Sequence, residues 1–310
     1  MNQPQQPQQP EQSRQPQRLN GVIRLLEEGR HVFASFAAPE PSAAVEYSSS
    51  QYDAIVFEAE HKPWDVLALR DSLQYLLNRR QIAESASLAP SVTPLVRIPV
   101  NGGERAQWQA KQALDLGAYG VVWPHVSTVE EAYNAVAACR YPRLPDAERY
   151  EPAGLRGDGP VAAARYWGLS TAEYYARSGV WPLDPDGEVL VVLMIEDQNG
   201  IRNLPQMLDR VPGIGLVLIG EGDLSQELGV PRQYEHPLVA ESRRRIAEIC
   251  HEHGVAVGHP HVTPGNLKQV LDEGYRFLMS APVRSHPALD LGRELTGRDA
   301  DAAGPAEKGL

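Results

Sequence analysis

Short apolar runs alternate with longer amphipathic stretches along most of the chain. The runs are rich in Val, Ile and Leu, as is typical of strands that are buried on both faces of a parallel sheet. Turn-forming and polar residues bound each run. We predict eight such strands, at residues 31–36, 52–58, 93–98, 120–123, 189–195, 215–219, 256–259 and 277–281.

The stretches between the runs have the spacing of helices. Leu69, Leu73 and Leu76, for example, recur at intervals that place them on one face of a helix. Comparable amphipathic stretches occupy residues 64–84, 104–116, 129–140, 237–253 and 265–273. Strands that alternate with helices favour right-handed crossovers and a parallel sheet. Eight repeats of this unit predict an α/β fold with a single (β/α)8 TIM barrel rather than an open sheet.

The barrel should occupy residues 19–297. Residues 1–18 form a Gln/Pro tract that cannot build a core, so we expect a disordered tail there. Residues 298–310 are polar and small, and we expect a second disordered tail. One connection, at residues 140–188, is far longer than an ordinary loop. We expect it to lie on the carboxyl face of the barrel and to shape the substrate site.

Charge and cysteine content narrow the possible partners. A net charge of -11 disfavours a nucleic-acid surface, because phosphate neutralisation needs clustered Lys and Arg. No apolar stretch approaches the length needed to span a bilayer, and the first residues lack the pattern of a secretory signal. Cys139 and Cys250 have no metal-type or redox-type spacing, which indicates a reducing compartment. We therefore expect a cytoplasmic protein without nucleic-acid or membrane partners.

Two carboxylates follow two consecutive predicted strands. Glu196 comes directly after the run at 189–195, and Asp223 follows the run at 215–219 by a few residues. The carboxyl ends of barrel strands are where enzymes of this architecture keep their chemistry. Two acidic oxygen ligands suit a hard divalent cation such as Mg²⁺ or Mn²⁺. Each acid could equally cap the helix that follows it, so both interpretations stay open.

Other predicted strand ends carry an arginine and histidines. His61 follows the second strand, Arg97 ends the third, and His259 ends the seventh. With a divalent metal, such a set favours stabilisation of an enolate formed from a 2-oxo acid: arginine holds the oxyanion and histidine moves the proton. Taken alone, His61 could be structural and Arg97 a surface ion pair.

Several motifs together carry a family resemblance. They are EAEHKP at 58–63, PLVRI at 94–98, LDLG at 114–117, VVWPHVSTVEEA at 121–132, LRGDG at 155–159 and IGEGDLSQELG at 219–229. In this order they resemble the HpcH/HpaI aldolase family, metal-dependent pyruvate aldolases related to citrate lyase β subunits. The resemblance runs from about residue 20 to 290. It implies a (β/α)8 barrel and a homohexamer in which paired subunits exchange their last barrel helix.

The resemblance also implies roles for individual residues. Glu196 and Asp223 would bind the metal, which would be Mg²⁺, Mn²⁺ or Co²⁺. Arg97 would stabilise the enolate and contact the substrate. His61 would be the base, steered by the carboxylate of Asp115. The backbone amides around Gly222 and Asp223 would hold the pyruvate carboxylate.

The chain departs from the family pattern at several positions. Glu221 replaces the usual proline and should place an extra acid beside the metal. His125 stands where family members commonly have Met or another apolar residue, and we include it among the substrate-binding residues. Insertions are expected near 101–103 and at 143–151. These changes bear on the aldehyde pocket and leave the metal–enolate machinery intact.

The expected function is reversible cleavage of a 4-hydroxy-2-oxo acid to pyruvate and an aldehyde through a metal-bound pyruvate enolate. The family resemblance associates such aldolases with aromatic compound catabolism. Alternatives within the same chemistry are decarboxylation of an oxaloacetate-like acid and cleavage of a CoA thioester. An alternative of another class is a catalytically idle barrel that serves as a binding subunit. No Lys stands at a predicted strand end, which disfavours a Schiff-base route.

Overall fold

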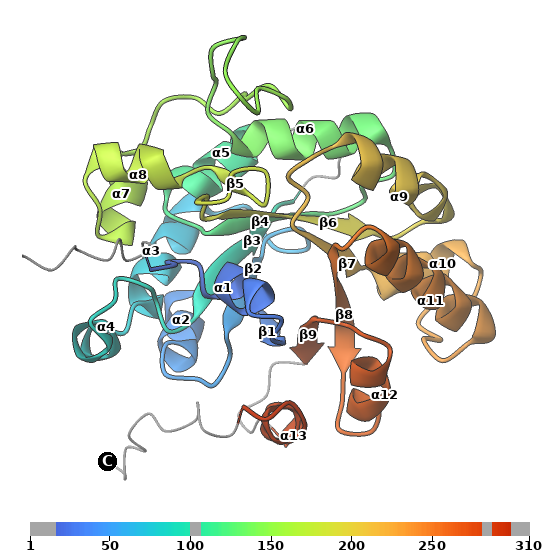
Figure 1. Ribbon diagram of the computed structural model, residues 1–310. Coiled ribbons are helices and arrows are strands. Elements are labelled where there is room, and N and C mark those ends of the chain that lie inside the picture. Colours follow the sequence, from blue (N-terminus) through green and yellow to red (C-terminus); the bar gives the residue numbers. More distant parts are fainter. Residues whose placement is uncertain (1–16, 100–106, 281–286, 299–310) are drawn as a thin grey trace, which may run out of the picture.

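A closed ring of eight parallel strands forms the centre of the structure, a computed structural model that describes residues 17–99, 107–280 and 287–298 (Figure 1). The strand order is β4-β3-β2-β1-β9-β8-β7-β6, and pairing of β4 with β6 closes the ring. A two-residue strand, β5, pairs with the start of β6. The strands are β1 (Val32–Ala37), β2 (Ala54–Glu58), β3 (Thr93–Arg97), β4 (Gly120–Trp123), β5 (Val180–Trp181), β6 (Val189–Ile195), β7 (Leu216–Ile219), β8 (Ala256–Val262) and β9 (Phe277–Ser280).

The apolar runs explain why these segments are strands. Every residue of β2, β3, β4, β6 and β7 is buried, because the ring interior covers one face and the helices cover the other. All eight predicted strands are confirmed. β8 continues beyond its predicted end, through His259 to Val262, and position 281 of the last predicted strand lies outside the described residues.

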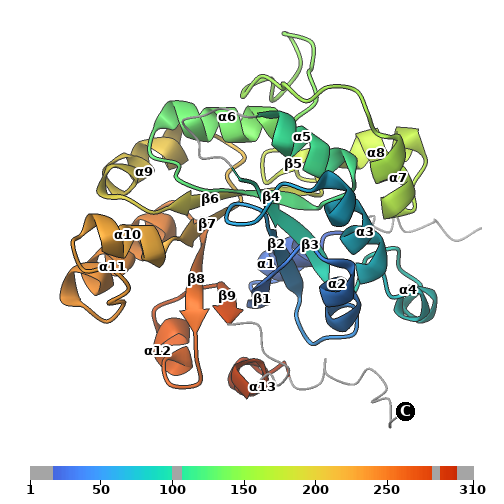
Figure 2. The same cartoon turned by 180° about the vertical axis from the view of Figure 1, so that it is seen from behind.

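Helices surround the ring on all sides, as the two opposite views show (Figures 1 and 2). Within the described part of the chain, none of them is long and apolar enough to cross a membrane. The helices are α1 (Gly21–Glu27), α2 (Pro41–Tyr47), α3 (Val66–Leu76), α4 (Arg79–Ser85), α5 (Gln107–Asp115), α6 (Val129–Cys139), α7 (Val161–Trp167), α8 (Thr171–Arg177), α9 (Gln198–Arg210), α10 (Glu221–Glu227), α11 (Pro237–Glu252), α12 (Leu267–Asp272) and α13 (Pro287–Leu295).

The amphipathic stretch at 64–84 is two helices rather than one. Leu77 adopts an extended backbone and ends α3. Asn78 then accepts a hydrogen bond from the backbone N–H of Gln81 and begins α4. Periodicity alone did not show this break, because no glycine or proline marks it. The expected insertion near 101–103 lies outside the described residues.

The segment that precedes β1 closes the amino-terminal end of the barrel. The buried carboxylate of Glu188, just before β6, accepts hydrogen bonds from the backbone N–H groups of Leu19 at 3.1 Å and Asn20 at 2.8 Å. The side chain of Asn20 in turn donates to the carbonyl oxygens of Tyr119 and Glu188, both at 3.0 Å. Arg18, which the sequence placed in the tail, donates to the carbonyl of Gly187 at 3.0 Å. Arg18 therefore belongs to the folded barrel rather than to the tail in which the sequence placed it.

The long connection at 140–188 also lies at the amino-terminal end, which corrects the expectation that it covers the carboxyl face. It starts where α6 ends and finishes where β6 begins, and helices of a (β/α)8 barrel run antiparallel to its strands. It contains α7, α8 and β5. The indole N–H of Trp167 donates to the carbonyl of Gly117, shortly before β4, at 2.8 Å. Gly117 has a φ of 111°, and a side chain there would overlap Tyr166.

The last described helix, α13, packs near the beginning of β1. A side chain at Gly292 would overlap the ring of Phe33, so the helix approaches β1 closely. Arg298, assigned to the tail from the sequence, pairs with Asp53 at 2.9 Å and donates to the carbonyl of His31 at 2.7 Å. The ordered part of the chain therefore extends at least to this residue.

Candidate active site

Four side chains that the sequence singled out, together with Glu58, lie at the carboxyl ends of barrel strands. Glu58 ends β2 and Arg97 ends β3, and the two residues are paired in register. Glu196 follows β6 directly, and Asp223 lies in the first turn of α10, just after β7. His125 follows β4, which pairs with both β3 and β6. The barrel therefore brings these five groups to one rim.

Glu196, Asp223 and His125 form a group that could hold a metal ion. One ligand atom from each residue lies within 4.8 Å of those of the other two. The side chain of Glu196 is 2% exposed and that of Asp223 is 45% exposed, so the group is buried on one side and open to solvent on the other. The donor set, two carboxylates and an imidazole, fits a divalent cation.

The turns after β6 and β7 shape the position of Glu196. A side chain at Gly220 would overlap the carboxyl group of Glu196, so this approach requires glycine. Asp197, rather than Glu196, caps α9 by accepting from the backbone N–H of Gly200 at 2.5 Å. Glu196 is therefore not a helix cap, and its carboxylate lies at the rim.

Two members of this cluster, Glu196 and His125, have displaced pKa values. Burial raises the pKa of Glu196 to about 7, and the neighbouring carboxylates of Glu60 and Asp223 add to the shift. The pKa of His125 is raised to about 9, chiefly by its hydrogen bond with Glu60 and then by the surrounding carboxylates. Excess negative charge at a buried position is the environment that a bound cation stabilises.

Arg97 is buried among acids rather than displayed on the surface. Its guanidinium pairs closely with Glu58, and its Nη1 lies 3.0 Å from Oε2 of Glu60. The guanidinium also lies over the ring of Phe36, 4.4 Å from the centroid. Nη1 is 3.7 Å from the sulfur of Met194, on the strand that leads to the metal group. These contacts exclude the surface ion pair as an explanation of Arg97.

Glu60 connects the groups of the rim, although sequence reasoning gave it no role of its own. Its carboxylate lies 3.0 Å from Arg97, 3.5 Å from Nε2 of His125 and 3.6 Å from Nε2 of His61. Burial favours the neutral acid, but the hydrogen bond with His125 and the nearby cations outweigh it and lower the pKa of Glu60. Glu60 could have been identified from its position two residues after Glu58, which ends β2.

His61 lies at the rim, but the structure does not bring Asp115 to it. The imidazole of His61 is 64% exposed. Asp115 ends α5, on the side of the barrel where strands begin, and its Oδ1 pairs with Nη2 of Arg156 at 3.0 Å. Within one chain the two residues therefore do not meet, and the expected steering of His61 by Asp115 stays a prediction. The spacing of the motifs did not reveal that the two residues belong to opposite ends of the barrel.

Glu221 does not place an extra acid beside the metal group. Its fully buried carboxylate points toward α11 and β8, where it pairs with Arg243 at 2.6 Å and with Nδ1 of His261 at 2.5 Å. His259 lies 3.8 Å away, and burial lowers its pKa to about 4. These residues line a cavity of about 390 Å³ that includes Tyr234, whose ring stacks on His261. The substitution of the usual proline thus builds a separate polar network.

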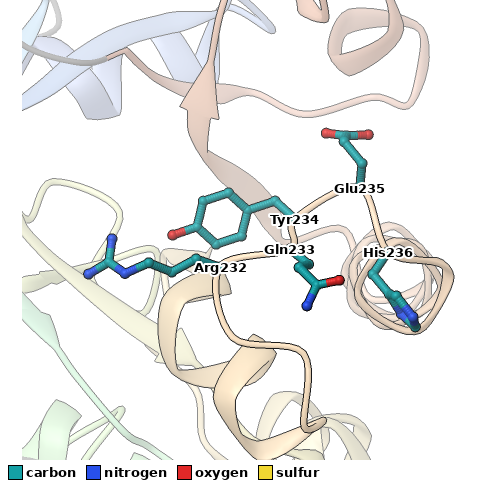
Figure 3. Close-up of a pocket in the computed structure, with 5 residues that line it drawn as sticks. All are labelled: Arg232, Gln233, Tyr234, Glu235 and His236. Atoms are coloured by element: carbon teal, nitrogen blue, oxygen red, sulfur yellow. The ribbon is translucent and has the colours of Figure 1, made fainter.

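A second cavity, of about 450 Å³, borders the segment that leads into α11 (Figure 3). Arg232 and Tyr234 extend to the same side of this segment, and His236 begins α11 by accepting from the backbone N–H of Leu238. Neither this cavity nor the one at Glu221 is lined by Glu196 or Asp223. The metal group is instead open to solvent at the rim, as the exposure of Asp223 indicates.

Comparison with known proteins gives a family model and curated relatives. The model described as HpcH/HpaI aldolase/citrate lyase matches residues 33–281. A hydroxypyruvate/pyruvate aldolase from Roseobacter denitrificans is 31% identical over 267 residues, which is 86% of this chain and 92% of the relative. A 2-keto-3-deoxy-L-rhamnonate aldolase from Klebsiella pneumoniae is 31% identical over 266 residues, covering 84% of this chain and 86% of the relative.

Comparison with solved structures identifies proteins of this family that have the same fold. An HpcH/HpaI aldolase/citrate lyase family protein from Burkholderia cenocepacia superposes with a TM-score of 0.68 at 25% identity, covering 90% of this chain and 96% of the other. An HpcH/HpaI aldolase from Desulfitobacterium hafniense superposes with a TM-score of 0.66 at 22% identity, covering 93% and 98%. The (β/α)8 barrel predicted from the sequence is thereby confirmed.

Proposed function

Because the chain belongs to the HpcH/HpaI aldolase/citrate lyase family, we propose that it is an aldehyde-lyase of the divalent-metal-dependent type. Its substrate is a 4-hydroxy-2-oxo acid, which it cleaves reversibly to pyruvate and an aldehyde. The curated relatives, a hydroxypyruvate/pyruvate aldolase and a 2-keto-3-deoxy-L-rhamnonate aldolase, support this reaction class. The observation that carries the proposal is the convergence of Glu196, Asp223 and Arg97 at one rim of the barrel.

The cleavage itself needs a proton acceptor and a stabilised enolate. The 4-hydroxyl group loses its proton, the bond between C3 and C4 breaks, and its electron pair remains on pyruvate as the enolate. We assign the proton transfer to the exposed imidazole of His61. We assign stabilisation of the enolate oxygen to Arg97, whose guanidinium Glu58 and Glu60 hold in place.

The backbone amides of Gly222 and Asp223 suit the carboxylate of the substrate. They lie in the first turn of α10, where N–H groups have no partner within the helix. A side chain built at Gly222 would meet open space, so a ligand can approach the backbone there. The carboxylate and the 2-oxo group of the substrate would then lie beside Asp223.

Glu196 and Asp223 would hold the divalent cation, which we propose is Mg²⁺, Mn²⁺ or Co²⁺. A bound cation would supply Lewis-acid polarisation of the 2-oxo group and positive charge near the enolate. We expect exhaustive treatment with EDTA to abolish pyruvate release and each of these ions to restore it. Pyruvate release is measured over a panel of 4-hydroxy-2-oxo acids. Full activity after chelation contradicts the proposal, and trapping of a lysine by borohydride would indicate a Schiff-base enzyme instead.

The same panel separates this function from its alternatives. Turnover of oxaloacetate without any aldehyde product would identify a decarboxylase. Dependence on CoA would identify a thioester lyase. Failure to exchange the methyl protons of pyruvate with solvent, together with no bound metal, would indicate a barrel that has no catalytic role.

His61 and Asp115 can act together only if they come from different copies of the chain. We propose a homo-oligomer, a hexamer by resemblance to the family, in which Asp115 of one copy lies near His61 of the next. Asp115 is 25% exposed at its side chain despite its pair with Arg156, so a neighbouring copy can reach it. An oxygen of this carboxylate would hold the imidazole tautomer that accepts the proton.

Subunit mixing tests this arrangement. His61→Ala and Asp115→Asn should each lower kcat, by about 10²-fold or more for loss of the base. Unfolding the two variants together and refolding them as mixed oligomers should restore part of the activity, because some sites then receive an intact residue from each copy. Refolding each variant alone is the control. No recovery in the mixture, with oligomers formed, would show that the two residues do not share a site.

We place this enzyme in the cytoplasm. Cys139 and Cys250 are both buried and unpaired, which agrees with a reducing compartment.

A further inference from the structure

His125 has an unusual backbone conformation for a residue of the substrate pocket. Its φ is 51°, in the left-handed region, which non-glycine residues seldom adopt. The backbone N–H in this conformation donates to Oε2 of Glu196 at 2.7 Å. The turn after β4 therefore holds His125 beside the carboxylate of Glu196, which we assign to the metal.

The two ring nitrogens of His125 face different carboxylates. Nδ1 lies 3.6 Å from Oε2 of Glu196, whereas Nε2 lies 3.5 Å from Oε1 of Glu60 and 3.9 Å from Oδ2 of Asp223. Adjacent ligands of an octahedral ion are about 3 Å apart, since each is about 2.1 Å from the metal. One ligand atom from each of His125, Glu196 and Asp223 lies within 4.8 Å of the other two, so movements of about 1–2 Å would bring the three around one ion.

We propose that His125 is a third protein ligand of the divalent metal and that it binds through Nδ1. This inference rests on the proposed metal site and adds a ligand to it. Glu60 then accepts a hydrogen bond from the Nε2–H group, as carboxylates beside metal-bound imidazoles commonly do, and acts as a positioning residue. The other positions of the ion would be open to a chelating 2-oxo acid and water.

A nitrogen ligand changes which metal the site prefers. Oxygen ligands suit Mg²⁺, whereas imidazole suits transition ions and binds Mg²⁺ poorly. The chain should therefore bind Mn²⁺ and Co²⁺ in clear preference to Mg²⁺. A site built from Glu196 and Asp223 alone would discriminate less between these ions.

The test is pulsed electron paramagnetic resonance of the full-length protein loaded with Mn²⁺. We expect a coupling to one imidazole nitrogen in the natural protein and its loss in His125→Asn. Asn is chosen because it tolerates a positive φ and offers an oxygen, so the turn should still form. His61→Gln is the matched control: it removes another imidazole from the same rim and should leave the nitrogen coupling unchanged.

A second measurement is the affinity for Mn²⁺ in competition with Mg²⁺, determined by isothermal titration calorimetry. The preference for Mn²⁺ should fall by roughly 10-fold or more in His125→Asn, the order of effect seen when support of a metal site is lost. A natural protein without nitrogen coupling, or a coupling that persists in His125→Asn, overturns the inference.

The outcomes distinguish this inference from the proposed function. Nitrogen coupling without metal-dependent formation of pyruvate would keep His125 as a ligand and reject the aldolase. Metal-dependent formation of pyruvate without nitrogen coupling would keep the aldolase and reject His125 as a ligand.

Discussion

Arg97 combines three contacts that a smaller cation cannot reproduce. Its planar guanidinium pairs with Glu58 and Glu60 at once and still lies over the ring of Phe36. Lysine keeps the charge but offers a single ammonium group without this fork. The arrangement thus fixes a donor before substrate arrives, which is what stabilisation of an oxyanion requires.

We therefore expect Arg97→Lys to lower kcat about 10²-fold, the effect of losing one oxyanion donor, while the barrel stays folded. Steady-state kinetics of pyruvate release provide the measurement. Arg70→Lys, at an exposed position on α3, is the matched control and should change nothing. Unchanged turnover in Arg97→Lys would leave this residue with a structural role only.

At the scale of elements, the sequence predicted strands better than helices. Buried strands are rich in apolar residues, so each appears as an apolar run, as β6 does. Helices α1, α2, α7, α8 and α10 have seven residues each, too few for a periodic pattern to repeat. Helix α9 contains Pro205, and the sequence predicted a helix after Glu196 without giving its bounds.

The difference between strand and helix patterns also explains which residues of the candidate site could be placed from the sequence. Residues at strand ends, such as Glu196 and Arg97, could be placed at the rim because parallel strands end at the same edge. The sequence carries no comparable signal for the direction in which a side chain points. Glu221 was therefore expected beside the metal, and the links that Glu60 makes were missed.

The end of β8 should make stability depend on pH. Burial lowers the pKa of His259 from its ordinary 6.5 to about 4, so the folded protein keeps this imidazole neutral. The unfolded chain binds the proton below about pH 6.5, which favours unfolding, so this contribution is present above pH 6.5 and is lost as the pH falls toward 4. The charged and titratable groups that face it are Glu221 from α10, Arg243 from α11, His261 from β8 itself and Tyr275 just before β9.

His259→Asn should reduce the loss of stability between pH 6.5 and 4.5. Asn retains an acceptor for the backbone N–H of His261, which now donates to Nδ1 of His259 at 3.2 Å. The measurement is the free energy of unfolding by urea at several pH values, with the unchanged protein as reference. Parallel curves for the two proteins would show that His259 does not carry this dependence.

At the scale of the whole molecule, the two ends of the barrel have separate tasks. The carboxyl end holds the metal group, and the amino-terminal end is closed by the segment around Asn20 and Glu188. Glu188 is fully buried and pairs with Arg177 while it accepts two backbone hydrogen bonds. Stability can therefore be changed at Glu188 without altering the groups at the rim.

Glu188→Ala should lower the free energy of unfolding by about 3–5 kcal/mol, because it leaves a partly buried cation and two buried N–H groups without their partner. Glu188→Gln keeps an acceptor and should cost less. Denaturation by urea measures both variants. Binding of Mn²⁺ well below the unfolding transition should match that of the natural protein, and weakened binding would show that the two ends are coupled.

Arg18 and Arg298 are both held at the amino-terminal end of the barrel, the first beside Gly187 and the second at His31 and Asp53. A carrier or solid support joined to the chain before residue 17 or after residue 298 would therefore attach at the end of the barrel opposite the metal group. Within one copy, the support would then not cover the rim of the barrel that it holds.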